Sequence, residues 1–137
     1  MEFYFEGIKP FKLMNVELIN WLSDVIKNEN KLVGEIVFIF CSDSYLLQIN
    51  NEFLNHDYFT DIITFDYVDG DIISGDIFIS YDRVLENSSV YETIFDKELY
   101  RVIVHGVLHL IGYNDKIESD QLIMREKEDY YLATFVD

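Results

Sequence analysis

Polar and apolar residues follow two different periods along this 137-residue chain. Residues 1–8 alternate phenylalanine with polar neighbours, and this period of two is typical of a half-exposed strand. Pro10 ends that pattern. Over residues 12–27 the apolar positions recur at helical spacing, which predicts an amphipathic helix that begins near Lys12 or Asn15.

The next segments predict a buried strand and a capped helix. Residues 34–40 are too few and too rich in β-branched side chains for a helix, which favours a strand. Ser42 and Asp43 are expected to cap a helix over residues 44–54, because their side chains can accept hydrogen bonds from free backbone N–H groups. The polar residues near its end suit a loop; they are Asn50, Asn51, Asn55 and Asp57.

The middle of the chain predicts a hairpin. Residues 60–67 and 75–80 have the composition of strands, and the segment between them is rich in turn-forming residues. Those turn residues are Asp69, Gly70, Asp71 and Ser74. Two strands joined by such a short polar segment are expected to pair with each other.

Three helices are expected to complete the chain, over about residues 81–92, 95–112 and 117–134. The middle helix is almost wholly apolar over residues 99–111. A helix with so little polar surface is expected to be the central buried element. Gly112 is placed as its C-terminal stop, since glycine readily adopts the left-handed conformation that ends helices.

These elements predict one α+β domain over residues 1–137, with about five helices packed against a small mixed sheet of four strands. Half of the residues are apolar, which excludes a disordered chain. Neither a membrane-spanning segment nor a secretory signal is expected, because no apolar run is long enough and the first residues carry no basic cluster. Cys41 is the single cysteine, which favours a reducing compartment, so we expect a cytoplasmic protein.

Charge is the most unusual property of the composition. The chain has 26 acidic and 10 basic residues, for a net charge of −16, and no Lys or Arg occurs between Val33 and Asp82. Nucleic-acid affinity usually comes from Lys and Arg, so this surface argues against broad RNA or DNA binding. The acidic residues serve either solubility or, in part, the binding of a cation.

A candidate metal site lies on the central helix. His105 and His109 are four residues apart, so both imidazoles can reach one point. Gly112 then allows the chain to turn back, and Asp115 can supply a third ligand. Two imidazoles and one carboxylate leave a fourth position open, the usual form of a catalytic zinc site. The spacing is that of metzincin-like sites, whereas the alternative is a pair of hydrogen-bonded core histidines.

Two further observations bear on this site. Zinc peptidases with the H-E-x-x-H motif carry a catalytic Glu directly after the first His, and here Gly106 occupies that position, which argues against a peptidase. The third histidine, His56, lies in a polar segment and is expected to be an exposed loop residue. Asp61 and Asp76 are candidates for orienting water or a ligand, although backbone hydrogen bonds at strand ends are the more ordinary role for them.

The segment from His105 to Tyr113 resembles, without a gap, the H-G-x-L-H-L-x-G-Y-D-H signature of the YbeY family of bacterial ribosome-associated metallo-endoribonucleases. Residues 60–65 resemble the family's T-D-V-L-S-F segment, and residues 75–77 its G-D-I. Further similar positions are Leu47, Asn50, Asp57, Met124 and Glu128. The resemblance implies one zinc ion per chain and metal-dependent cleavage of single-stranded RNA. It also implies a role in rRNA maturation, notably at the 3′ end of the small-subunit RNA, and in ribosome quality control.

Two positions depart from the family pattern. Asp115 stands where the third zinc ligand is usually His, and Leu54 stands where the family has an Arg, the natural partner of a scissile phosphate. Lys97, Arg83 and Arg101 are possible replacements. Arg101 is the better candidate, since it lies one helical turn before His105, although an ion pair is the more ordinary role for it.

The sequence therefore predicts a zinc-dependent endoribonuclease with metal ligands His105, His109 and Asp115 and a candidate catalytic residue Arg101. Its expected partners are single-stranded regions of rRNA and the small ribosomal subunit. The main alternative is a non-catalytic zinc protein whose acidic surface docks on a basic ribosomal protein. A zinc peptidase is the weaker third alternative.

Overall fold

The computed structural model describes residues 1–56 and 58–135. Its centre is a mixed four-stranded sheet in the order β1-β2-β4-β3. The strands are β1 (Glu2–Glu6), β2 (Leu32–Cys41), β3 (Ile62–Asp66) and β4 (Ile72–Ser80). β2 pairs in parallel with both β1 and β4, while β3 and β4 form the predicted antiparallel hairpin.

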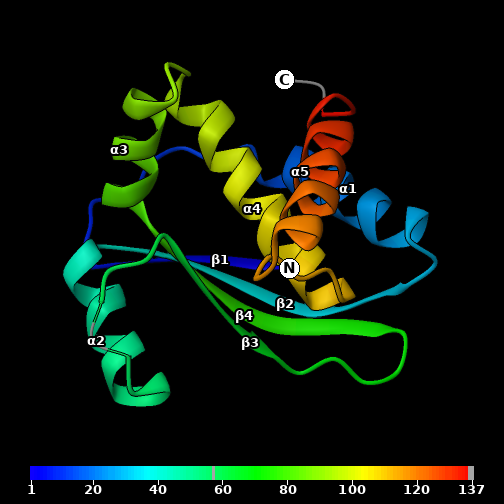
Figure 1. The fold of residues 1–137 in the computed structure, drawn as a ribbon, viewed down its shortest axis with the longest axis horizontal. Helices are drawn as coiled ribbons and strands as arrows, with labels where there is room; N and C mark the ends of the chain where they lie inside the picture. The colour runs from blue at the N-terminus through cyan, green and yellow to red at the C-terminus, as the bar shows by residue number, and fades with distance from the viewer. Residues whose placement is uncertain (57, 136–137) are drawn as a thin grey trace.

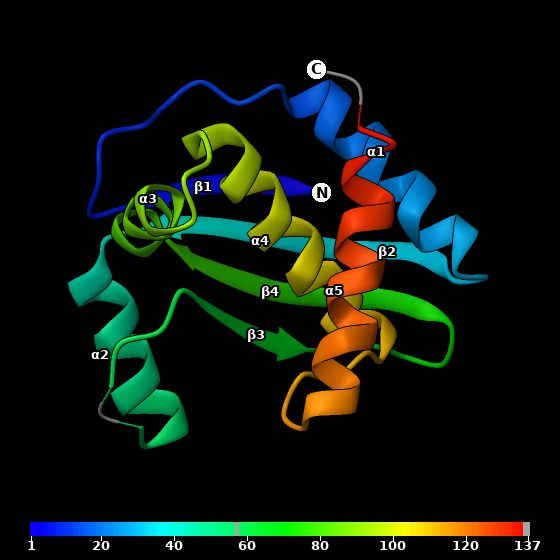
Figure 2. The ribbon, with the colours of Figure 1, turned by 45° about the horizontal axis from the view of Figure 1, so that its top comes forward.

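The helices lie on both sides of this sheet, unevenly distributed. α1 (Asn15–Asn28), α3 (Tyr81–Val90), α4 (Phe95–Ile111) and α5 (Glu118–Leu132) gather on one side, and α2 (Asp43–Leu54) packs on the other side beside β3 and β4 (Figures 1 and 2). The expected α+β class, with five helices and a four-stranded mixed sheet, is confirmed.

The larger core lies between the sheet and α4. Alternate residues of β2 and β4 face this helix, and the two central phenylalanines, Phe38 and Phe40, are fully buried. Nine residues of α4 are buried, so the prediction that this helix is the central element is confirmed. A smaller apolar cluster on the opposite face joins Leu46 of α2 to Ile63 of β3.

Gly106 explains how closely α4 approaches the sheet. A Cβ atom at this position would lie 2.9 Å from Ile62 and 3.0 Å from Ile77. The position that holds the catalytic Glu in H-E-x-x-H peptidases therefore faces the packed sheet here and has no room for a side chain. This packing supplies a structural reason for the glycine and agrees with the argument against a peptidase.

The predicted start of the first helix is confirmed, whereas the assignment of two asparagines to a loop was wrong. The first helix begins at Asn15, one of the two predicted starting points, after the N-cap residue Met14. Asn50 and Asn51 belong to α2 and not to a loop, and Asn50 is buried. Polar residues misled the prediction because a buried asparagine can sit in a helix when its amide is hydrogen-bonded.

Other sequence predictions for this region hold. Ser42 is the N-cap of α2 and accepts a hydrogen bond from the backbone N–H of Tyr45. Asn55 ends the helix in the left-handed conformation. Asp57, assigned to the same loop, lies outside the described residues. Over the described chain, every helix is too short or too polar to cross a bilayer.

Candidate metal centre

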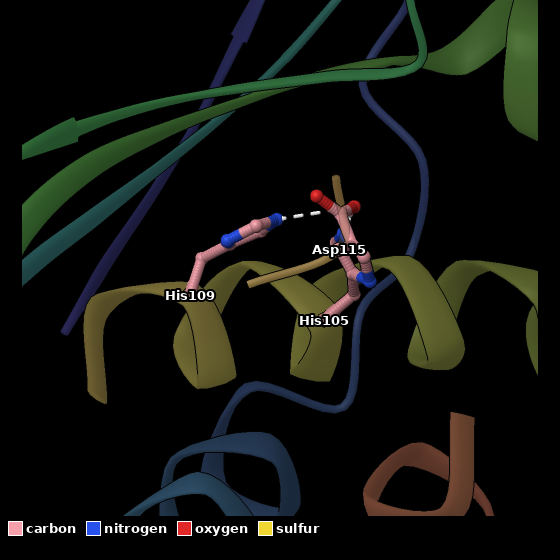
Figure 3. Close-up of side chains that lie close together, drawn as sticks. All are labelled: His105, His109 and Asp115. Atoms are coloured by element: carbon pink, nitrogen blue, oxygen red, sulfur yellow. Dashed lines mark ion pairs between the residues drawn. The ribbon is translucent and has the colours of Figure 1, made fainter. Parts of the chain in front are cut away.

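His105 and His109 lie on successive turns of α4, on the same side of the helix. Their rings lie 4.6 Å apart, centre to centre, and both side chains are directed toward Asp115 (Figure 3). The helix ends at Gly112, whose φ of 124° is strained for any residue with a side chain. The glycine turn leads the chain back, so that Asp115 faces the two imidazoles.

The three side chains form one compact group, which we call the metal-ligand cluster: His105, His109 and Asp115. Asp115 Oδ2 lies 3.2 Å from His105 Nε2 and 3.3 Å from His109 Nε2. One ligand atom from each residue lies within 4.8 Å of the others. Two ligands of a tetrahedral zinc ion, each about 2.0–2.1 Å from the metal, are about 3.4 Å apart, so the donor set and its spacing fit zinc.

Glu128 of α5 holds the far side of one imidazole. Its Oε2 lies 2.6 Å from His105 Nδ1, and its side chain is only 7% exposed. Burial alone would lower the pKa of His105, but the hydrogen bond to Glu128 and the nearby carboxylates outweigh it, so the pKa is raised. With the proton held at Nδ1, the lone pair of Nε2 faces the metal-ligand cluster.

Arg101 completes this chain of contacts. Its guanidinium nitrogens lie 2.9 Å from Glu128 Oε1 and 2.7 Å from Asp129 Oδ1, and its side chain is 17% exposed. Arg101 thus connects to the metal-ligand cluster through Glu128. The predicted contact of Arg101 with a phosphate stays a prediction, and the structure shows its guanidinium engaged by two carboxylates.

The two other candidate carboxylates, Asp61 and Asp76, line different hollows. Asp61 lines a hollow of about 480 Å³ together with all three residues of the metal-ligand cluster. Burial raises the pKa of Asp61, while His105 partly opposes this shift. Asp76 points to the opposite face of the sheet, beside Phe65 and Phe78, so its suggested role at the site was wrong.

His56 is exposed, as predicted, yet it lines the same hollow. Leu54 and Lys116 also line it, and Lys116 is the one Lys or Arg among its described lining residues.

The role of Glu128 was not predicted from the sequence. Its helical spacing to Met124 and Tyr131, which are both buried, indicated that Glu128 faces inward. A carboxylate on the inward stripe of a helix needs a partner, and a histidine on the facing helix is an obvious one.

The fold and the metal-ligand cluster define an α+β protein in which two imidazoles of the central helix and one carboxylate of the loop after it form a group able to hold a metal ion. Comparison with known proteins identifies the family. A family model described as Endoribonuclease YbeY matches residues 8–136. This chain belongs to the YbeY family, as its sequence resemblance predicted.

Curated relatives and a solved structure agree with this assignment. An endoribonuclease YbeY from Flavobacterium psychrophilum is 56% identical over 117 residues, 85% of this chain and 84% of that protein. One from Phocaeicola vulgatus is 49% identical over 128 residues, 93% of each chain. A solution structure of a Thermotoga maritima protein has a TM-score of 0.68 at 28% identity and covers 95% of this chain and 86% of its own.

Proposed function

We propose that this protein is a zinc-dependent endoribonuclease that hydrolyses phosphodiester bonds in single-stranded RNA. Membership of the YbeY family supports the endoribonuclease activity. The proposal extends this to zinc as the metal, to single-stranded regions of rRNA as the substrate and to the small ribosomal subunit as the partner. We also propose a role in rRNA maturation and in ribosome quality control, which would be carried out in the cytoplasm.

The convergence of His105, His109 and Asp115 is the observation that carries the metal dependence. A bound zinc ion would supply Lewis acidity, which polarises a phosphate oxygen and makes water more acidic. His105 and His109 would donate their Nε2 lone pairs to it, and Asp115 a carboxylate oxygen. Glu128 would keep the proton of His105 at Nδ1, which fixes the imidazole in the required tautomer.

Asp61 is the candidate to orient the attacking water. Its carboxyl group lies in the same hollow as the metal-ligand cluster, and the residue is half-buried. In hydrolysis one water molecule is consumed: its oxygen bonds to phosphorus, the bond to the leaving ribose oxygen breaks, and that oxygen gains a proton. Burial raises the pKa of Asp61, the direction that favours the exchange of a proton by a carboxyl group.

Arg101 has two proposed roles that one variant separates. If Arg101 contacts the phosphate, Arg101→Gln raises the KM for RNA and leaves zinc affinity unchanged. If Arg101 acts by positioning Glu128, the same variant weakens zinc binding. Its ion pairs with Glu128 and Asp129 support the positioning role.

The proposal is tested with zinc-loaded protein and labelled single-stranded RNA, duplex RNA and casein. We expect cleavage of the single strand, little cleavage of the duplex and none of casein. Asp115→Asn should lose both zinc and cleavage, because it replaces a charged ligand by a neutral amide. Glu126→Gln makes the same kind of change at an exposed position of α5 and should retain both.

The other outcomes of this experiment decide between the alternatives. Full zinc content without cleavage of any substrate would contradict the enzyme and favour an assembly factor that docks on a basic ribosomal protein. The net charge of −16 would suit such a partner. Cleavage of casein would support a peptidase, and RNA cleavage that persists after zinc is removed would contradict the metal dependence.

A further inference from the structure

An endoribonuclease with 10 basic and 26 acidic residues has few basic side chains with which to hold RNA. Proteins that bind single strands combine cations on the backbone with aromatic side chains on the bases. Lys116 is the one Lys or Arg among the described residues that line the hollow beside the metal-ligand cluster. Apart from the proposed metal ion, the hollow therefore offers the phosphates little positive charge, and aromatic contacts can provide a larger share of the affinity.

An aromatic pair lies in that hollow. The rings of His56 and Tyr58 are stacked, with centroids 5.1 Å apart and planes inclined by 22°. The Tyr58 hydroxyl and His56 Nδ1 are 3.0 Å apart and form a hydrogen bond. Tyr58 is 55% exposed, so much of its ring surface is free, and both residues line the hollow that contains His105, His109 and Asp115.

Buried Asn50 anchors the backbone on both sides of this pair. Its backbone carbonyl oxygen accepts a hydrogen bond from the backbone N–H of His56 at 3.1 Å, and its side-chain Nδ2 donates to the backbone carbonyl oxygen of Tyr58 at 2.9 Å. Asn50 is only 2% exposed. One buried helix residue thus holds the backbone of both His56 and Tyr58, and this restraint reduces the entropy that is lost when a ligand stacks on the rings.

We infer that His56 and Tyr58 form a stacking platform for an unpaired RNA base next to the bond that is cleaved, and this inference rests on the proposed function. The two rings are too close together for a base to enter between them, so the base stacks on the exposed ring surface. A base in a duplex has both faces covered by its neighbours and cannot use the platform. The pair therefore supplies a physical basis for selecting single strands.

The test compares RNA binding by zinc-loaded variants, measured by fluorescence anisotropy on a short labelled single strand whose integrity is checked after each titration. We expect Tyr58→Leu to raise the Kd by about 5- to 140-fold, the equivalent of about 1–3 kcal/mol for one stacked base. Tyr58→Phe keeps the ring and loses the hydrogen bond to His56, so its Kd should rise by no more than about threefold. Zinc content should be unchanged in both.

Tyr130→Leu is the matched control. Tyr130 is 58% exposed, close to the value for Tyr58, but it lines a different hollow, between α1 and α5. Its removal should leave the Kd for RNA unchanged. A strand of the same length with abasic riboses provides a second control, because wild-type protein should bind it about as weakly as Tyr58→Leu binds the normal strand.

The outcomes separate this inference from the function on which it rests. If Tyr58→Leu retains its zinc and binds the single strand within about twofold of wild type, the platform is wrong while the endoribonuclease stands. If wild-type protein binds the abasic strand as tightly as the normal one, base stacking is likewise excluded. Wild-type protein that neither binds nor cleaves single-stranded RNA would overturn both proposals.

Discussion

The short loop after α4 contributes one residue to each of two clusters that contain a carboxylate. Tyr113 and Asp115 are two residues apart, just beyond the end of α4. Tyr113 contacts Glu29 at the end of α1, in a group we call the Glu29 cluster: Glu29, Tyr113, Lys127 and Tyr131. Asp115 turns instead toward the metal-ligand cluster.

In the Glu29 cluster the carboxylate is fully paired by the protein itself. It accepts hydrogen bonds from the hydroxyl of Tyr113 at 2.5 Å, from the ammonium of Lys127 at 3.1 Å and from the hydroxyl of Tyr131. Burial would raise the pKa of Glu29, but these three donors lower it overall. The protein supplies its own cation, so this cluster is structural.

The carboxylate of the metal-ligand cluster has different partners. Over residues 1–56 and 58–135, no Lys or Arg forms an ion pair with Asp115, and its nearest partners are two imidazoles. Metal-binding histidines are neutral, so the carboxylate keeps its charge for an added cation. The contrast teaches that a carboxylate close to histidines and without a protein cation marks a ligand site, whereas a carboxylate with its own lysine marks a structural link.

His109→Ala is expected to have the largest effect on zinc affinity, and it tests whether the metal-ligand cluster binds the ion. Loss of a direct ligand should reduce zinc affinity by more than the about 10- to 100-fold that loss of an outer partner costs. RNA cleavage should fall with it. Zinc titration by calorimetry and cleavage assays on the same preparation measure both. Zinc affinity equal to that of the wild type would show that the metal is bound elsewhere.

Glu128→Gln should have the next largest effect. Glu128 does not belong to the metal-ligand cluster, but it fixes the ring of His105 and holds the proton at Nδ1. We expect zinc affinity to fall about 10- to 100-fold. Glu126→Gln makes the same chemical change two residues away, at an exposed position, and should leave the affinity unchanged. Equal affinities in the two variants would remove the positioning role of Glu128.

Much of the fold was accessible from the sequence because the apolar periods are strong. The alternation in β1, the hairpin of β3 and β4 and the apolar length of α4 each predicted the element that the structure contains. The pairing of β2 with both β1 and β4 in parallel was not predicted. Strand order depends on contacts between distant segments, and the period of one segment carries no information about its neighbours.

The candidate site was likewise only partly predictable from the sequence. His105, His109 and Asp115 were accessible because helical spacing and one glycine define their positions. Glu128, Asn50 and the stacking of His56 on Tyr58 were not, because each depends on how α2, α5 and the sheet pack together. That the cluster binds zinc, and that the chain is a single domain, stay predictions.

Glu29→Gln tests the structural role of the Glu29 cluster by its effect on the stability of the fold. The substitution removes the charge that the three donors share and leaves a neutral amide in a site that is 9% exposed. Hydrogen bonds to charged groups contribute about 1.5–3 kcal/mol, so the free energy of unfolding should fall by about 2 kcal/mol. Urea denaturation measures this loss. Zinc affinity should change much less than in Glu128→Gln, and an equally large loss of zinc affinity would contradict the separation of the two clusters.

The smallest expected effect is the pH dependence of that stability difference. Because the pKa of Glu29 is lowered in the folded protein, its contribution is present above its usual value near 4.5 and is lost as the pH falls through the lowered folded value. The free energies of unfolding of wild type and Glu29→Gln should therefore converge as the solution is acidified from pH 6 to below pH 4. Urea denaturation of the two metal-free proteins at each pH measures the difference directly. A difference that stayed constant over this range would mean that the Glu29 charge does not stabilise the fold, and the cluster would then owe its stability to packing of the two tyrosines.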